Sequence, residues 1–140
     1  MSIERFIKAQ ENAYEVALIE IKQGYKQSHW MWYIFPQIKG LGYSSTAQYY
    51  AIQDKKEAID YMNHPVLSRR LIEMSEELLK INSNNANEVL GYPDDLKLKS
   101  SMTLFYLTSK NETFKKVLDK FFNGELDENT IMLLNDILPS

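Results

Sequence analysis

The stretch PVLSRRLIEMSEELLKI, residues 65–81, carries a strong helical pattern. Its large apolar residues recur at spacings of three and four, at Leu67, Leu71, Met74, Leu78 and Ile81. This spacing places them on one face of an α-helix. Pro65 suits the first turn of that helix, because the N–H group that proline lacks would have no helical partner there. The stretch therefore predicts an amphipathic helix packed on a hydrophobic core.

Helical patterns continue on both sides of this stretch. Apolar residues recur through residues 3–21, and Gly24 follows as a stop signal. Asp54 and Glu57, three positions apart, have the spacing of a capping box. Further helix starts are predicted at Ser44-Ser45-Thr46, Pro93-Asp94-Asp95, Asn111 and Asp127, the last one leading a face of Ile131, Leu134, Ile137 and Leu138.

The predicted fold class is all-α. The 140 residues suit one domain, residues 1–140, and 44% hydrophobic with 25% charged residues is typical of a globular chain. We find neither an internal repeat nor a linker, and expect a compact, irregular bundle of about six to eight helices. Residues 31–35 also suit a short strand, but no second alternating segment offers a partner, so helix or irregular structure is favoured there.

Composition excludes several functions. The chain has no cysteine, so disulfides, thiolate metal sites and cysteine nucleophiles are absent. Its two histidines, His29 and His64, lack ligand spacing, and we expect no metal and no cofactor. With a net charge of -3 and no basic stripe, nucleic acid is not an expected partner. The start lacks a signal peptide and the longest apolar run is too short for a membrane span, so we expect a cytoplasmic protein.

The most informative segment is KQSHWMWYIFPQ, residues 26–37, in a long aromatic-rich loop that runs to Ser45. One interpretation is a pocket with Trp30 and Trp32 as walls and Lys26, His29 and Gln37 as polar contacts, because pockets combine aromatic walls with a few polar groups. The alternative is that the rings close one end of the bundle. The sequence leaves both open.

Other candidate groups lie outside this run. Gly40 and Gly42 before Ser44 resemble an anion-binding turn, although a plain turn before a helix is the simpler interpretation. Lys97 and Ser101, four apart on the helix that starts at Asp94, share a face. Either they complete the pocket together with Arg70, or Lys97 is solvated and the acids only cap the helix; the sequence leaves both open. Gln10 and Arg70 lie on or beside apolar stripes, and since buried polar groups need partners, we predict that both meet the aromatic segment.

These motifs resemble a bacterial family of unknown function, domain of unknown function 1810, some of whose members are labelled calpastatin-like. The resemblance covers nearly the whole chain and implies an all-helical fold with no established activity. Tyr43 stands where the family commonly has arginine, and Ser68 where it commonly has glycine. The motifs are Arg5-Phe6 with Ala9-Gln10, Ser28-His29-Trp30-Met31-Trp32 through Phe35-Pro36-Gln37, Gly40-Leu41-Gly42 with Ser44, His64-Pro65-Val66-Leu67 with Arg70-Leu71, and Asp94-Asp95-Leu96-Lys97 through Ser100-Ser101-Met102-Thr103-Leu104-Phe105.

Three functional hypotheses follow. The first is a small-molecule pocket, for a nucleotide-like or phosphorylated ligand, built by the segment Lys26–Ser45 and the start of the helix Asp94–Thr108. Its ligand-binding candidates are Lys26, Ser28, His29, Trp30, Trp32, Gln37, Ser44, Arg70, Lys97 and Ser101. His29 and Lys26 are the catalytic candidates, but the sequence does not decide whether the chain is an enzyme.

The second hypothesis is a protein- or peptide-binding module, whose partner the sequence does not name. Its exposed anchors would be Trp30, Trp32, Tyr43, Tyr49 and Tyr50. The third is a purely structural role for the motif.

Overall fold

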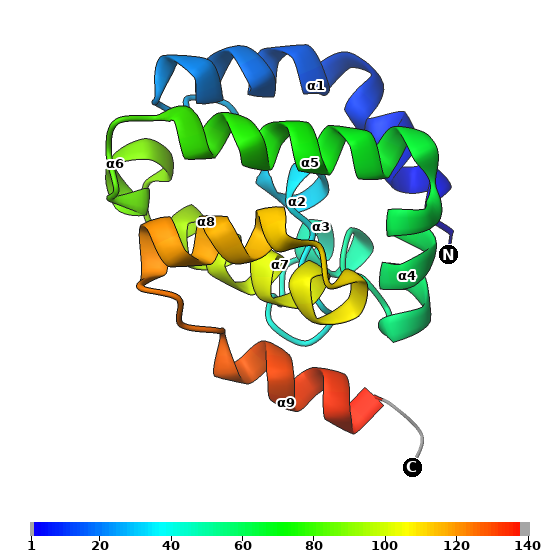
Figure 1. The fold of residues 1–140 in the computed structure, drawn as a ribbon. Helices are drawn as coiled ribbons and strands as arrows, with labels where there is room; N and C mark the ends of the chain where they lie inside the picture. Colours follow the sequence, from blue (N-terminus) through cyan, green and yellow to red (C-terminus); the bar gives the residue numbers. More distant parts are fainter. Residues whose placement is uncertain (1, 138–140) are drawn as a thin grey trace.

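The computed structural model describes residues 2–137, which contain nine helices and no strand (Figure 1). The all-α prediction is confirmed, but the expected six to eight helices were too few, because the polar run before residue 90 hides a short helix. The helices are α1 (Glu4–Gln23), α2 (Met31–Ile34), α3 (Ser45–Tyr49), α4 (Lys55–Asn63), α5 (Pro65–Lys80), α6 (Ala86–Leu90), α7 (Asp94–Ser109), α8 (Glu112–Phe122) and α9 (Glu128–Ile137).

Helix α5 is the amphipathic helix that residues 65–81 predict. It lies along α1 and also contacts α8 and α4 (Figure 1). The predicted stripe faces the core, since Leu67, Leu71, Met74 and Leu78 are all buried. Its start is capped by His64, whose Nδ1 accepts the N–H groups of Val66 and Leu67.

Helix α7 runs through the middle of the fold and contacts α8, α4, α6 and α9. Its residues 100–105 are all buried, as expected of a helix that other helices surround. Helix α9 packs on α7 at the opposite side of the molecule from α1 (Figure 1). Leu134 of α9 is buried as predicted, whereas Leu138 lies outside the described residues.

Most predicted helix ends are confirmed. Gly24 ends α1 with φ at 81°, in the left-handed region that glycine tolerates. Asp54 accepts the N–H of Glu57 at 2.9 Å, as half of the expected capping box, and Asp127 accepts the N–H of Thr130 at 3.0 Å. The second half of the box does not form, because the Glu57 carboxylate binds other groups.

The segment after α1 is helical for one turn only. Helix α2 ends at Ile34, two residues before Pro36, so the helical interpretation of residues 31–35 is confirmed over the strand. An isolated parallel bridge joins Ile38 to Ile52, which ties the end of the aromatic segment to the chain after α3. None of the helices within residues 2–137 is long and apolar enough to cross a bilayer.

A buried ion pair joins the start of α1 to the start of α4. Arg5 donates to Glu57 at 2.7 Å and 3.0 Å, and the two side chains are 3% and 10% exposed. The remaining Arg5 N–H groups bind the backbone carbonyls of Tyr49, at 2.7 Å, and Ala51, at 2.7 Å, and that of Ser2. All five guanidinium donors are therefore used inside the protein.

We expect Arg5→Ala to destabilise the fold by about 3 to 5 kcal/mol, because it leaves the buried Glu57 carboxylate unpaired. The double variant Arg5→Met/Glu57→Gln should recover only part of that loss, since the backbone carbonyls would still lack donors. Urea unfolding measures both. Lys56→Met, in an exposed ion pair with Asp60, is the control and should change the free energy of unfolding little. An Arg5→Ala variant as stable as this control would contradict the prediction.

Candidate functional site

The aromatic segment is organised around one carboxylate, that of Glu20 near the end of α1. Glu20 is 6% exposed and accepts hydrogen bonds from the N–H of Gln27 at 2.8 Å, the N–H of Ser28 at 3.0 Å and the indole N–H of Trp30 at 2.9 Å. The Ser28 hydroxyl donates to its second oxygen. Burial alone would raise the pKa of Glu20, but these hydrogen bonds outweigh it and lower the pKa from 4.5 to about 2.

A second charged cluster holds the segment against α7. Lys26 Nζ lies 2.8 Å from a carboxylate oxygen of Asp94, and Lys97 Nζ lies 3.4 Å from the other. Each ammonium also faces an indole, Lys26 at 5.1 Å from the ring of Trp30 and Lys97 at 5.0 Å from that of Trp32. The start of α7 is therefore fixed to the first half of the segment, and the ammonium groups of both lysines are paired with Asp94 within the protein.

Five of the predicted site residues come together here: Lys26, Ser28, Trp30, Trp32 and Lys97. Ser101 lies one turn beyond Lys97 on α7. It is completely buried, and within the described residues its hydroxyl has no hydrogen-bond partner.

Arg70 lies in a separate cluster between α1 and α5. It donates to the Gln10 side chain at 3.3 Å and lies 5.1 Å from the ring of Tyr14. Gln10 in turn donates to the carbonyl of Tyr33 at 2.8 Å, in α2. The prediction that Gln10 meets the aromatic segment is confirmed, and Arg70 reaches that segment through Gln10. Burial, followed by the hydrogen bond to Glu73, raises the pKa of Tyr14.

Within residues 2–137, the side chains of the three other predicted residues form no hydrogen bond or ion pair with either cluster. His29 is exposed, and its carbonyl accepts the Tyr33 hydroxyl at 3.3 Å. The Gln37 carbonyl accepts the N–H of Ile52 at 2.8 Å. Ser44 caps α3 by accepting the N–H of Ala47 at 3.1 Å. As α3 has only five residues, we assign Ser44 a capping role.

A cavity of about 510 Å³ opens beside the second half of the segment. No residue of α7 lines it. Two tyrosine rings dominate it, Tyr43, which is 84% exposed, and Tyr49, which is 49% exposed. The lining residues are Lys39, Gly40, Gly42, Tyr43, Ser45, Gln48, Tyr49, Ala51 and Gln53.

Two glycines shape the turn that forms one wall of this cavity. A Cβ atom at Gly42 would lie 2.6 Å from the Cβ of Ala47 in α3. A Cβ at Gly40 would lie 3.0 Å from Leu133 in α9, and the φ of Gly40 is 111°. Side chains at either position would push the turn away from its neighbours, so the close packing of residues 40–43 depends on glycine.

The fold and the clusters define a small all-α domain in which an aromatic segment is pinned by buried charged groups. Residues 1–134 match the family described as protein of unknown function (DUF1810), and the chain belongs to this family, as its motifs indicate. It is similar to the crystal structure at 1.38 Å of the conserved hypothetical protein Rv1873 from Mycobacterium tuberculosis, with 40% identity, a TM-score of 0.93 and coverage of 95% of this chain and 96% of that one. Comparison with curated proteins finds no match.

Sequence reasoning missed the two acids that organise the segment. Glu20 reads as a solvated residue of an amphipathic helix, and Asp94 as a helix-dipole partner. The sequence did contain a signal that Glu20 is buried. A serine and an indole N–H, both able to donate to a carboxylate, follow within ten residues, and the segment that carries them is rich in aromatic rings that favour burial. Lys39 and Gln53 of the cavity carry no local signal, since they are adjacent only in the folded chain.

We expect Glu20→Gln to lower the free energy of unfolding at neutral pH by on the order of 3 kcal/mol, because charged hydrogen bonds are lost in a buried place. The folded-state pKa lies below the unfolded one, so Glu20 contributes its stability above about pH 4.5 and loses it as the pH falls toward 2. Urea unfolding of both proteins across this range tests the sign.

The difference between wild type and Glu20→Gln should therefore shrink as the pH falls. The exposed Glu15→Gln on the same helix is the control and should show little difference at any pH. A Glu20→Gln difference that does not change with pH would show that the charge of Glu20 is not needed.

Proposed function

We propose that this protein binds a small planar ligand that carries a negative charge, such as a nucleotide, in the cavity lined by residues 39–53. The supporting observation is the lining itself, which combines two tyrosine rings with one lysine and contains no acid among its described residues. The volume of about 510 Å³ is within the range of about 300 to 1,000 Å³ that is typical of small-molecule sites.

The aromatic walls favour a planar ligand. Tyr43 and Tyr49 keep large ring surfaces in contact with water, and a flat ring stacked on them would remove that surface from water. The Tyr43 backbone is held in place, because its carbonyl accepts the Gln48 side chain at 2.7 Å. The close packing of Gly42 on Ala47 restrains the same turn. A wall that is ordered before binding lowers the entropic cost of binding.

Lys39 supplies the charge preference. Within the part of the chain that the structure describes, its ammonium has no carboxylate oxygen within 4.0 Å, unlike those of Lys26 and Lys97. The backbone N–H of Lys39 donates to the Ile52 carbonyl at 2.9 Å, which fixes the backbone at the cavity edge. An unpaired lysine beside an apolar surface favours a phosphate or carboxylate group.

The proposed site differs from the predicted one in its position. The sequence combined the whole segment Lys26–Ser45 with the start of α7, but Lys97 and Asp94 hold the first half of that segment. We assign Lys26, Trp30 and Lys97 a positioning role, because their polar groups are engaged inside the protein. Neither catalytic candidate, His29 or Lys26, lines the cavity, and we propose no reaction.

A protein-binding role is the second candidate. Of its predicted anchors, Trp30 is only 1% exposed and offers no surface to a partner. Tyr43 and Tyr49 are exposed, as a residue that anchors a partner protein has to be. The specific observation in favour is a hollow beside the exposed Met132 of α9, which Tyr43 also lines.

We expect a panel of nucleotides, ADP-ribose, sugar phosphates and inorganic phosphate to contain a ligand that raises the melting temperature. At a hundred times its dissociation constant, a ligand stabilises the fold by about 2.7 kcal/mol, which is a shift of several degrees. Isothermal titration calorimetry then gives the dissociation constant for the wild type, Lys39→Ala and Tyr43→Ala. Lys39→Ala should weaken charged ligands more than their uncharged nucleosides, whereas Tyr43→Ala should weaken both.

Two matched controls lie elsewhere on the surface. Lys8→Ala removes an exposed lysine of α1, and Tyr92→Ala removes a tyrosine that is 76% exposed and does not line the cavity. Both should bind as the wild type does. The proposal fails if nothing in the panel binds, or if binding survives both Lys39→Ala and Tyr43→Ala unchanged.

A further inference from the structure

On the described part of α9, one large apolar side chain, that of Met132, is exposed to water beside a hollow. Met132 is 61% exposed, and Tyr43, which lines the same hollow, is 84% exposed. The hollow measures about 310 Å³ and is lined by Gly40, Leu41, Tyr43, Asn129, Met132 and Leu133. Two exposed apolar surfaces that line one hollow offer a partner side chain a place to be buried.

The two walls of this hollow are held in place. Gly40 packs so closely on Leu133 that a Cβ atom would not fit without displacement. The start of α9 is fixed to α7, because the N–H of Asp127 donates to Thr103 at 2.9 Å and its carboxylate accepts the Ser100 hydroxyl at 3.3 Å. The surface is therefore formed before any partner arrives.

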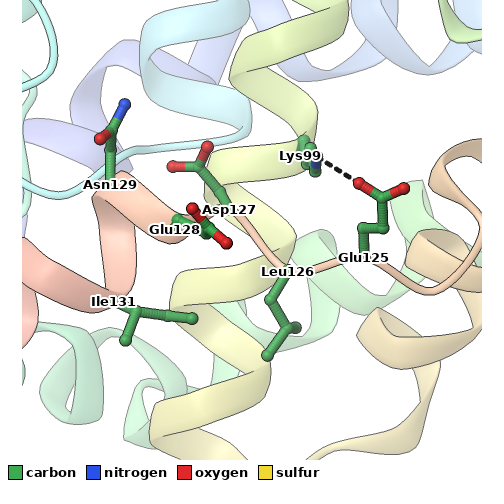
Figure 2. Close-up of a pocket in the computed structure, with 7 residues that line it drawn as sticks. All are labelled: Lys99, Glu125, Leu126, Asp127, Glu128, Asn129 and Ile131. Carbon is green, nitrogen blue, oxygen red and sulfur yellow. Dashed lines mark ion pairs between the residues drawn. The ribbon is translucent and has the colours of Figure 1, made fainter.

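A second hollow, of about 640 Å³, adjoins the first, since Asn129 lines both. Figure 2 shows its lining residues, which come from α7, from the chain before α9 and from the first turn of α9. The dashed line marks the ion pair of Lys99 and Glu125, whose charged atoms lie 3.6 Å apart. Three of the lining residues are acids, Glu125, Asp127 and Glu128, against the one lysine. The apolar hollow is therefore continued by a hollow of net negative charge.

Among these acids, Glu128 is the one free to meet a partner. Asp127 is occupied by the helix cap and by Ser100. Glu125 is near Lys99. Glu128 is exposed, and among the described residues it has no lysine or arginine nitrogen within 4.0 Å.

We propose that this face of α9 docks an extended segment of another protein in which an apolar side chain and a lysine or arginine are separated by one residue. Glu128 and Met132 are four residues apart, so they share a helix face and lie about 6 Å apart along its axis. An extended chain rises about 3.3 Å per residue and points every second side chain the same way. Two residues of such a chain therefore span from Met132 to Glu128.

The chemistry assigns one side chain to each end. The apolar residue of the partner covers Met132 and fills the hollow between Tyr43 and Leu133. The basic residue reaches Glu128, and a basic residue is favoured over an acidic one because the adjoining hollow carries more carboxylates than ammonium groups. This surface is distinct from the proposed ligand cavity, with which it shares only Gly40 and Tyr43.

The experiment selects binders from a phage-displayed library of random peptides against the whole protein. We expect enriched peptides to carry an apolar residue and a lysine or arginine two positions apart. Fluorescence anisotropy of a labelled enriched peptide then gives its affinity. Met132→Glu should weaken binding more than tenfold, and Glu128→Gln about fivefold or less, the value for an exposed ion pair.

Charge exchange provides the decisive comparison. Glu128→Lys should weaken the peptide further, and a peptide with glutamate in place of its basic residue should bind Glu128→Lys better than it binds the wild type. Glu11→Lys, an exposed change of the same charge on α1, is the control and should bind both peptides as the wild type does. Thermal melts check that each variant is folded, and Glu128→Gln remains the test if Glu128→Lys is not.

The inference is overturned if the library yields no binder, if binding is unchanged in Met132→Glu, or if enriched peptides show no basic residue at the required spacing. None of these outcomes depends on Lys39 or Tyr49, so the failure of the docking surface and the failure of the ligand cavity are distinguishable.

Discussion

The buried pair of Arg5 and Glu57 is the interaction on which the proposed site depends. A guanidinium with five donors in a dry place must find five acceptors. Glu57 supplies two of them, and backbone carbonyls before α1 and at or just after the end of α3 supply the other three. Arg5 therefore fixes the carbonyls of Tyr49 and Ala51, two residues that line the ligand cavity. Glu57 adds a third restraint by accepting the N–H of Gln53 at 3.0 Å. The wall of the proposed ligand cavity is thus positioned by a charge pair that does not itself line the cavity.

Glu20 fixes the start of the aromatic segment, as Arg5 fixes the chain after it. Its carboxylate can be buried only if N–H and O–H groups satisfy it, and the backbone of residues 27–28 bends around it for that reason. The indole of Trp30 is oriented by the same acid. Once Trp30 is placed, Lys26 and Asp94 meet beside it and lock α7 to the segment. The chain between residues 27 and 51 is therefore held at both ends, by Glu20 at one end and by Arg5 at the other. The turn at residues 40–43 lies between these two anchors.

The difference between what the sequence predicts and what it does not has a physical basis. Helices such as α5 and α7 are predictable because their periodicity and caps are local, and the same holds for Gly24 and Asp127. The sequence does not show which charged residues are paired inside the fold, because a charged residue looks identical in sequence whether it is solvated or internally paired. Lys26 and Lys97 were assigned to a ligand, but in the fold each has Asp94 and an indole as partners.

The contacts of Gln10 and Arg70 were predictable, because a polar side chain on an apolar stripe will be buried and therefore needs a hydrogen-bond partner. The cavity, in contrast, arises where two turns meet across the bridge between Ile38 and Ile52. No local sequence pattern predicts that these two turns lie side by side. The glycines at 40 and 42 gave a hint of a special turn, but its role is packing against α3 and α9, which only the three-dimensional arrangement defines.

The turn at residues 40–43 also joins the two proposed surfaces. Gly40 and Tyr43 line the cationic cavity on one side and the apolar hollow of α9 on the other. The two proposals assign these surfaces opposite charge preferences, one based on Lys39 and the other on Glu128. Any ligand that shifts this turn changes the affinity of the α9 face by a factor that thermodynamic linkage makes reciprocal. The size of that factor is limited by the packing of Gly40 on Leu133 and of Gly42 on Ala47, because a turn held so closely has little room to move.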